Sequence, residues 1–261
     1  MDRALSGGGP PGAASADPTV RLSLLGGFRL WVDGVDDSLP VGAQRLLALL
    51  ALRGRMSRSR TAGMLWPDAT ERRALACLRT AIWRVNHVAP RILRVSSVAV
   101  DLAPDVDVDV RRLELAADAL TDAAGGDEEV LRAWRMVPRG VGDLLADWED
   151  EWLADDRQRV QQLHVHVLEL FSARFTDLGR FGPAMDAALL ALRADPLRES
   201  AHRAVIRIHL AEGNPVDAKR ALDFCRLVLA RDAGVEPSGV TTRLVLPPGP
   251  LVDAHPLPRS G

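Results

Sequence analysis

An arginine-rich segment between Pro67 and Val85, PDATERRALACLRTAIWRV, carries the side chains with the clearest chemistry in this chain. If this segment forms a helix with 3.6 residues per turn, one set of side chains lies on a single side of that helix. That set is Arg72, Arg73, Arg79, Thr80, Trp83 and Arg84. A guanidinium group bridges phosphates or donates two hydrogen bonds to a guanine edge. These residue types therefore indicate contact with the major groove of DNA.

The other side of the same segment is apolar. Leu75, Leu78, Ile82 and Val85 recur at helical spacing, so they are predicted to pack on a core while the basic side faces outward. An ordinary amphipathic helix with a solvated basic face has the same pattern. For this helix taken alone, that second interpretation stays open.

Charge is distributed unevenly along the chain, although the formal net charge is only −2. Residues 42–94 hold eleven Arg against Asp68 and Glu71, a balance of +9. Residues 101–156 hold seventeen acidic residues against five Arg, a balance of −12. A basic block followed by an acidic one is typical of a nucleic-acid-binding domain followed by a different module, with chance clustering as the alternative.

Length and composition favour two globular domains in a reducing compartment. The chain has 261 residues and 47% hydrophobic residues, without an apolar run long enough for a transmembrane helix. Residues 1–17 lack the apolar stretch of a secretory signal and are expected to form a flexible leader. Cys77 and Cys225 form no CxxC pair, which indicates a protein of the reducing cytoplasm. Since the arginine-rich segment indicates DNA contact, we expect it to be associated with the nucleoid.

The elements expected around the arginine-rich helix follow the order of a winged helix-turn-helix. Two short strands flank Gly26 and Gly27 within residues 20–32, and a largely buried helix covers 42–53. Ser57 caps a second helix that ends at Trp66, and the arginine-rich helix begins near Thr70 and ends before Pro90. A hairpin around Ser96 and Ser97 would form the wing, so Arg94 in its first strand joins the candidate DNA-contacting residues.

The second half of the chain is predicted to be helical, over residues 110–124, 127–136, 147–179 (with at least one break), 181–194, 197–212 and 215–231. A shift of 34 residues aligns Gly179 with Gly213 and Ala184 with Ala218. This period is typical of tetratricopeptide repeats, although two unrelated amphipathic hairpins would also produce these matches. The proline-rich end, residues 240–261, is expected to be a disordered tail.

Motifs for catalysis or for cofactor and metal binding fail on spacing. The single lysine, Lys219, follows no glycine-rich turn, so the chain has no P-loop. His164 and His166 lie about 200° apart on a helix and cannot share one ion. His202 and His209 lie on nearly one face but lack a third ligand. We therefore expect neither an enzyme nor a bound cofactor or metal.

Several segments resemble one family of regulators across about residues 20–239. RLSLLGGFRL and LWPDATERRALACLRTAIWRV are similar to the opening strands and recognition helix of actinobacterial SARP-type (Streptomyces antibiotic regulatory protein) activators. GDLLADWEDEWLADDRQRVQQL, LRADPLRESAHRAVIRIHLAEGN and ARDAGVEPS are similar to their bacterial transcriptional activation domain. Two residues of the second helix depart from the family pattern: Thr61 stands at an apolar position, and Gly63 is unfavourable in a helix.

The resemblance implies a mainly α protein of two domains. Residues 18–104 would form a winged helix-turn-helix with small β elements, and residues 105–239 an all-α, tetratricopeptide-like activation domain. The implied function is a transcription activator that binds direct repeats in double-stranded promoter DNA. It would contact RNA polymerase or a second protomer, as a possible homodimer on DNA. The alternative is a tetratricopeptide-like interaction regulator with weak or no DNA binding.

Overall fold

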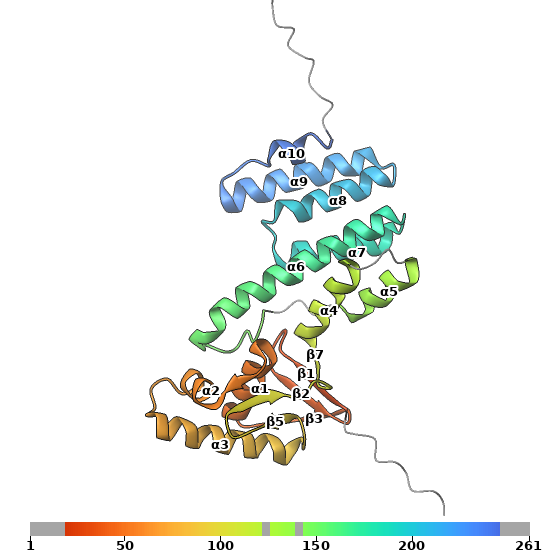
Figure 1. Cartoon of the computed structure of the whole chain (residues 1–261). Helices are drawn as coiled ribbons and strands as arrows, with labels where there is room; N and C mark the ends of the chain where they lie inside the picture. Colours follow the sequence, from red (N-terminus) through yellow and green to blue (C-terminus); the bar gives the residue numbers. More distant parts are fainter. Residues whose placement is uncertain (1–18, 122–125, 139–142, 246–261) are drawn as a thin grey trace, which may run out of the picture. The chain divides into compact units, whose positions relative to one another are not determined.

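The computed structural model describes residues 19–121, 126–138 and 143–245 (Figure 1). The predicted leader, residues 1–17, and residues 246–261 of the predicted tail lie outside the described residues. The chain divides into two compact units. Among the described residues, the first unit holds 19–21, 29–50 and 54–106, and the second holds 22–28, 51–53 and 107–245.

The first part of the chain contains short strands and three helices. In chain order they are β1 (Val20–Ser23), β2 (Arg29–Val32), β3 (Val35–Asp37), α1 (Val41–Arg53), β4 (Met56–Ser57), α2 (Arg58–Leu65), α3 (Glu71–Val88), β5 (Leu93–Val95), β6 (Ala99–Leu102) and β7 (Asp107–Val108). The strands form a four-stranded sheet of order β3-β2-β1-β7 and a three-stranded sheet of order β4-β6-β5. The predicted strands around Gly26 and Gly27 are neighbours in the first sheet. β3, β4 and β7 were not predicted.

Helix α1 is the central core element of the first unit, as its apolar sequence predicted. Leu46, Leu47, Leu49 and Leu50 are completely buried. The helix ends at Gly54, whose φ of 68° favours a residue without a side chain. A helix that is apolar on most sides must be covered on most sides, whereas α3 buries only one face.

The second unit is helical after β7. Its helices are α4 (Asp109–Thr121), α5 (Asp127–Met136), the 3-10 helix η1 (Glu151–Leu153), α6 (Ala154–Asp177), α7 (Phe181–Ala194), α8 (Glu199–Ala211), α9 (Pro215–Ala233) and α10 (Gly239–Thr242). Of the predicted segment 147–179, residues 147–150 are not helical, and η1 continues directly into α6, so the expected break within the segment is absent. Helix α10 was not predicted. Helices α6 and α7, and likewise α8 and α9, pack as successive hairpins (Figure 1).

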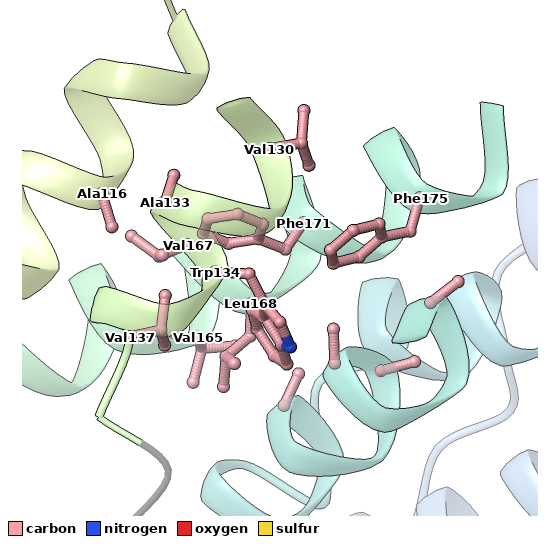
Figure 2. Close-up of a cluster of buried hydrophobic side chains, with 14 of the residues drawn as sticks. Ala116, Val130, Ala133, Trp134, Val137, Val165, Val167, Leu168, Phe171 and Phe175 are labelled. Carbon is pink, nitrogen blue, oxygen red and sulfur yellow. The ribbon is translucent and has the colours of Figure 1, made fainter. Parts of the chain in front are cut away.

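Three aromatic rings form the centre of the second unit's core (Figure 2). The ring of Trp134 on α5 lies 5.1 Å from that of Phe171 and 5.8 Å from that of Phe175, both on α6. The Trp134–Phe175 pair meets edge to face, an arrangement that aromatic quadrupoles favour. These contacts tie α5 to the first helical hairpin.

The turns of the two hairpins have the same geometry at the 34-residue spacing noted in the sequence. Gly179 and Gly213 both have positive φ, 67° and 82°. After each glycine the next residue donates its backbone N–H to a carbonyl five residues earlier: Arg180 to Phe175 and Asn214 to His209, each at 2.8 Å. Both hairpin turns therefore have the same glycine cap, a common way for a helix to end, at positions 34 residues apart.

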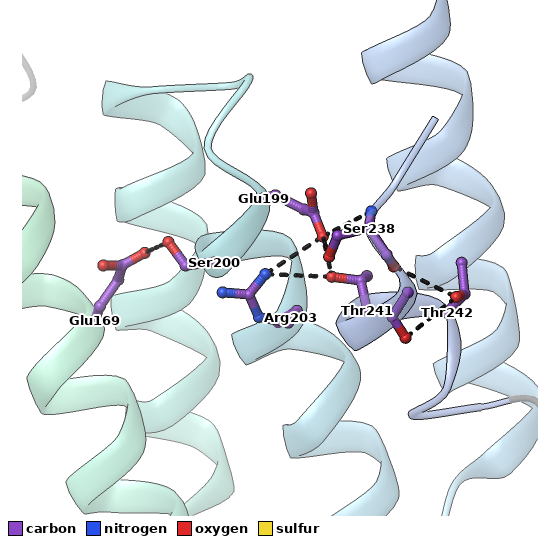
Figure 3. A network of polar contacts seen from close by, with 8 residues as sticks. Glu169, Glu199, Ser200, Arg203, Ser238, Thr241 and Thr242 are labelled. Carbon is purple, nitrogen blue, oxygen red and sulfur yellow. Dashed lines mark hydrogen bonds and ion pairs between the residues drawn. The ribbon is translucent and has the colours of Figure 1, made fainter. Parts of the chain in front are cut away.

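The segment that follows α9 corrects the predicted start of the tail (Figure 3). Residues 240–245 belong to α10 and a following turn, and Thr241 is completely buried. The Glu199 carboxylate accepts hydrogen bonds from Ser238, from Thr241 and from Arg203, the last at 3.3 Å. Burial alone raises the pKa of Glu199, but these hydrogen bonds outweigh it, so the pKa is lowered.

Candidate nucleic-acid interface

Helix α3 has one buried face, which fixes the orientation of the other. Its buried residues are Ala74, Leu78, Ala81, Ile82 and Val85. The predicted stripe was correct at three positions. Leu75 is only half-buried, because the buried arc is centred on Ala74, Leu78 and Val85, and Leu75 lies at its edge. The helix begins after Thr70 with Glu71 in its first turn, where a carboxylate complements the helix dipole.

All six α3 residues singled out from the sequence are exposed. They are Arg72, Arg73, Arg79, Thr80, Trp83 and Arg84. Among the described residues, no carboxylate forms an ion pair with any of their four guanidinium groups. In contrast, arginines of the second unit such as Arg198 and Arg220 are paired with neighbouring acids. The exposed face of α3 therefore keeps its positive charge available for an anionic partner.

Helix α2 and the turn before α3 position this face. Ser57 caps α2 as predicted, accepting a hydrogen bond from the Arg60 backbone N–H at 3.3 Å. Thr61, which departs from the apolar pattern, is completely buried and donates its hydroxyl to the Ser57 carbonyl at 2.9 Å. The substitution is tolerated because the buried hydroxyl has an acceptor within its own helix.

The predicted wing is the hairpin of β5 and β6. Ser96 closes its turn: the side-chain oxygen accepts the Ala99 backbone N–H at 3.0 Å. Arg94 on β5 is exposed and lies opposite Asp101 in the ladder. Arg94 and the exposed Arg55, which precedes β4, line a hollow of about 260 Å³ beside the wing. Arg55 was not singled out from the sequence, because the pairing of β4 with β6 is not visible in its two-residue strand.

An aromatic pair projects from the outer face of α3. The rings of Trp83 and His87, one turn apart, stack with centroids 5.5 Å apart and an interplanar angle of 15°. The Arg84 guanidinium carbon lies 5.2 Å from the centre of the Trp83 ring, a cation–π distance. Trp83 remains 58% exposed despite both contacts. His87 was missed in the sequence, although its i, i+4 spacing from Trp83 was available as a signal.

Other potential binding chemistry is sparse in the described part of the chain. Within residues 19–121, 126–138 and 143–245, no group of three His, Cys, Asp or Glu side chains could hold a metal ion. Two of the histidines considered as metal ligands have contacts within the fold. His202 contacts the Pro196 carbonyl at 2.9 Å.

Burial lowers the pKa of His164, and a hydrogen bond to the Pro138 carbonyl partly offsets this lowering. Across the described residues, every helix is too short or too polar to cross a membrane.

Comparisons with known proteins agree with this architecture. The sequence model of the bacterial transcriptional activator domain matches residues 106–246. The fold is similar to that of Mycobacterium tuberculosis EmbR, solved in complex with a low-affinity phosphopeptide, with a TM-score of 0.69 and 18% sequence identity. The match covers 87% of this chain and 64% of the EmbR chain, so this chain spans less than two thirds of EmbR's length. Among curated proteins, no sequence matches.

The family match covers more than half of the chain, and the resemblance to SARP-type regulators stated from the sequence is confirmed. The expected fold class, a winged-helix-like β/α region followed by a helical region, is confirmed as well. This family is one of transcriptional activators and not of enzymes. The chain belongs to the bacterial transcriptional activator domain family.

Proposed function

We propose that this protein is a DNA-binding transcription activator that places α3 in the major groove of double-stranded promoter DNA. One observation carries the proposal: the exposed face of α3 holds four arginines without a carboxylate partner among the described residues, on a helix whose other face is buried. A helix fixed by its core and charged on its outer face has the orientation that groove insertion requires.

Within this proposal the α3 residues divide into two roles by their place on the helix. Arg72, Arg79 and Trp83 form one row along the outer face, and we assign this row to base edges. Arg73, Thr80 and Arg84 lie towards one side, where phosphates would be nearer. Arg94 and Arg55, beside the wing, would add phosphate contacts from a second element.

The second unit is proposed to make the protein contacts of activation, with RNA polymerase or with another protomer on adjacent repeats. Its early part is acidic, which disfavours binding to phosphates. The proposed tetratricopeptide-like stack also offers a groove. A hollow of about 250 Å³ between α6 and α8 is lined by Thr176, Ser200 and Arg207, among others.

This groove supports a second candidate function, an interaction regulator with weak or no DNA binding. The hydroxyl of Ser172 lines the groove, is buried and has no hydrogen-bond partner among the described residues. Repeat proteins use such grooves between successive hairpins to bind peptides. The two functions differ in one measurable property, the affinity of the whole chain for duplex DNA.

The test is a titration of promoter DNA with the full chain at several salt concentrations. For about four to six phosphate contacts, the logarithm of the binding constant should fall with the logarithm of the salt concentration with a slope of roughly −4 to −5. Arg94→Ala and Arg55→Ala should each make the slope less steep by about 1 without changing sequence preference. Arg207→Ala, in the second unit, serves as the matched control and should leave the slope unchanged.

A protein that shows no DNA shift at low salt, or a binding constant independent of salt, would favour the interaction regulator. In that case the α6–α8 groove becomes the first surface to probe. Loss of sequence preference in Arg79→Ala, together with an unchanged sequence preference in Arg94→Ala and Arg55→Ala, would support the division of roles.

A further inference from the structure

A mostly apolar hollow of about 430 Å³ lies along one side of α3, within the first unit. Its floor is formed by the start of α1, the end of α2 and one side of α3: Pro40, Ala43, Trp66, Ala76 and Ala81. The hollow exists because several of the residues that line it are small. Gly42, which has no side chain, leaves open space in front of the Trp66 ring. A Cβ atom at Gly42 would lie 3.4 Å from that ring. The volume falls in the range of small-molecule sites, roughly 300–1,000 Å³.

Cations border this apolar space. Arg73 and Arg84 both line the hollow, and among the described residues neither forms an ion pair with a carboxylate. They are three turns apart on α3, about 16 Å along the helix axis. The hollow is therefore elongated, apolar along its length and positively charged towards its ends.

We infer that this hollow binds an elongated apolar molecule carrying a carboxylate, and that its occupancy competes with DNA. The apolar body takes the space over Trp66 and Ala76, and the carboxylate pairs with a guanidinium of Arg73 or Arg84. A neutral apolar molecule cannot form an ion pair with either arginine. A short acid leaves the apolar floor of the hollow exposed to water, so each is expected to bind more weakly.

The acid and DNA are expected to compete because they share residues, and this expectation rests on the proposed function. Arg73, Thr80 and Arg84 line the hollow and also belong to the proposed DNA-contacting face. A guanidinium that holds a ligand carboxylate is no longer free for a phosphate. A bound acid therefore lowers the affinity for DNA, which gives the regulator a chemical signal that acts directly on its recognition helix.

The experiment measures binding of decanoate to the full chain by calorimetry, below the concentration at which decanoate forms micelles. Decanol and acetate are the matched probes, one without the charge and one without the chain. Decanoate is expected to bind saturably with one site, and decanol and acetate at least about tenfold more weakly, since each lacks one of the two interactions. Decanoate should also slow the reaction of half-buried Cys77, which lines the hollow, with N-ethylmaleimide.

Two sets of variants locate the site. Gly42→Leu fills the hollow from α1, away from the proposed DNA contacts, and should weaken decanoate binding at least about tenfold. Gly63→Leu is the matched control, because nothing lies within 4 Å of a Cβ atom at Gly63 and it does not line the hollow. The double variant Arg73→Ala/Arg84→Ala should reduce decanoate binding to the level of decanol.

Arg79→Ala separates this inference from the proposed function, because Arg79 does not line the hollow. That variant should keep decanoate binding while losing DNA affinity. The inference is overturned if decanoate does not bind saturably, if decanol binds equally well, or if Gly42→Leu leaves binding unchanged. Saturable binding of decanoate without any loss of DNA affinity would overturn the competition. A chain that binds decanoate but no DNA keeps the site and rejects the proposed function.

Discussion

The carboxylate of Asp109 accepts the backbone N–H of Leu24 at 2.9 Å, although the two residues are 85 positions apart in the chain. The same oxygen accepts the Leu25 N–H at 2.9 Å and the Ser23 hydroxyl at 2.8 Å, and the other oxygen accepts the Val110 N–H at 2.8 Å. Asp109 is only 2% exposed. One buried carboxylate therefore satisfies the backbone of a segment from the start of the chain within the second unit.

Replacing this carboxylate should destabilise the second unit. Asp109→Ala leaves three backbone N–H groups and a hydroxyl without their acceptor, so we expect a loss of about 3 kcal/mol or more in the free energy of unfolding. Asp109→Asn should lose less, because its amide oxygen still accepts on one side. Urea denaturation of the full chain measures both, with exposed Asp105→Ala as a control expected within about 0.5 kcal/mol of the parent. Equal stability of Asp109→Ala and the parent would mean that segment 22–28 is held by other contacts.

The two faces of α3 predict opposite phenotypes for neighbouring residues. Ile82 is buried, so Ile82→Ala should lower the free energy of unfolding by about 2–5 kcal/mol. Arg79 is exposed, so Arg79→Ala should leave stability within about 0.5 kcal/mol but weaken DNA binding by about 1–3 kcal/mol. Thermal melting and a DNA titration of both variants separate the effects. A normally folded Ile82→Ala that has lost DNA binding would contradict this assignment of the faces.

Periodicity allowed most elements to be predicted, because long amphipathic helices repeat their signal over several turns. The bounds of α5 and α7 agree with the predicted ranges 127–136 and 181–194. The misses have a common cause. The two-residue strands β4 and β7 have no period of their own and exist only through their partners.

The predicted domain limits, 18–104 and 105–239, differ from the two units for a similar reason. Segments 22–28 and 51–53 belong to the second unit through contacts made by distant residues. Gly26 donates its backbone N–H to the Asp143 carbonyl at 3.1 Å, and Arg53 pairs with Asp156 at 2.9 Å. The spacing of residues within either segment does not predict these contacts with residues far along the chain. The exposed face of α3 was predicted better, because its residues repeat along one long helix.

Helix α2 offers a stabilising substitution. Gly63 lies inside this helix with an ordinary helical backbone, and nothing lies within 4 Å of a Cβ atom built there. Alanine removes the conformational freedom that glycine has in the unfolded chain, so Gly63→Ala should add up to about 1 kcal/mol to the free energy of unfolding. Gly54→Ala is the matched control, since its φ of 68° makes a side chain unfavourable and should lower stability. A stabilised Gly54→Ala with an unchanged Gly63→Ala would contradict the backbone assignments of both glycines.

His164 makes the stability of the second unit depend on pH. Burial lowers its pKa below the ordinary value of 6.5, partly offset by its hydrogen bond to the Pro138 carbonyl. The unfolded chain therefore binds a proton at a higher pH than the folded chain. Stability is constant with respect to this group well above pH 6.5 and falls as the pH drops below that value. The melting temperature of the full chain should accordingly be lower at pH 5 than at pH 7.5.

The matched pair His164→Gln and His166→Gln isolates this contribution, because the two histidines lie on the same helix and only His164 is buried. His164→Gln cannot be protonated in this range, so its melting temperature should change less between pH 7.5 and pH 5 than that of the parent. His166→Gln should keep the parental difference, because it leaves the buried His164 in place. The lowered pKa of Glu199 affects stability mainly below its ordinary value of 4.5, so that carboxylate contributes little between pH 7.5 and pH 5. A pH difference that persists unchanged in His164→Gln would show that His164 is not the responsible group.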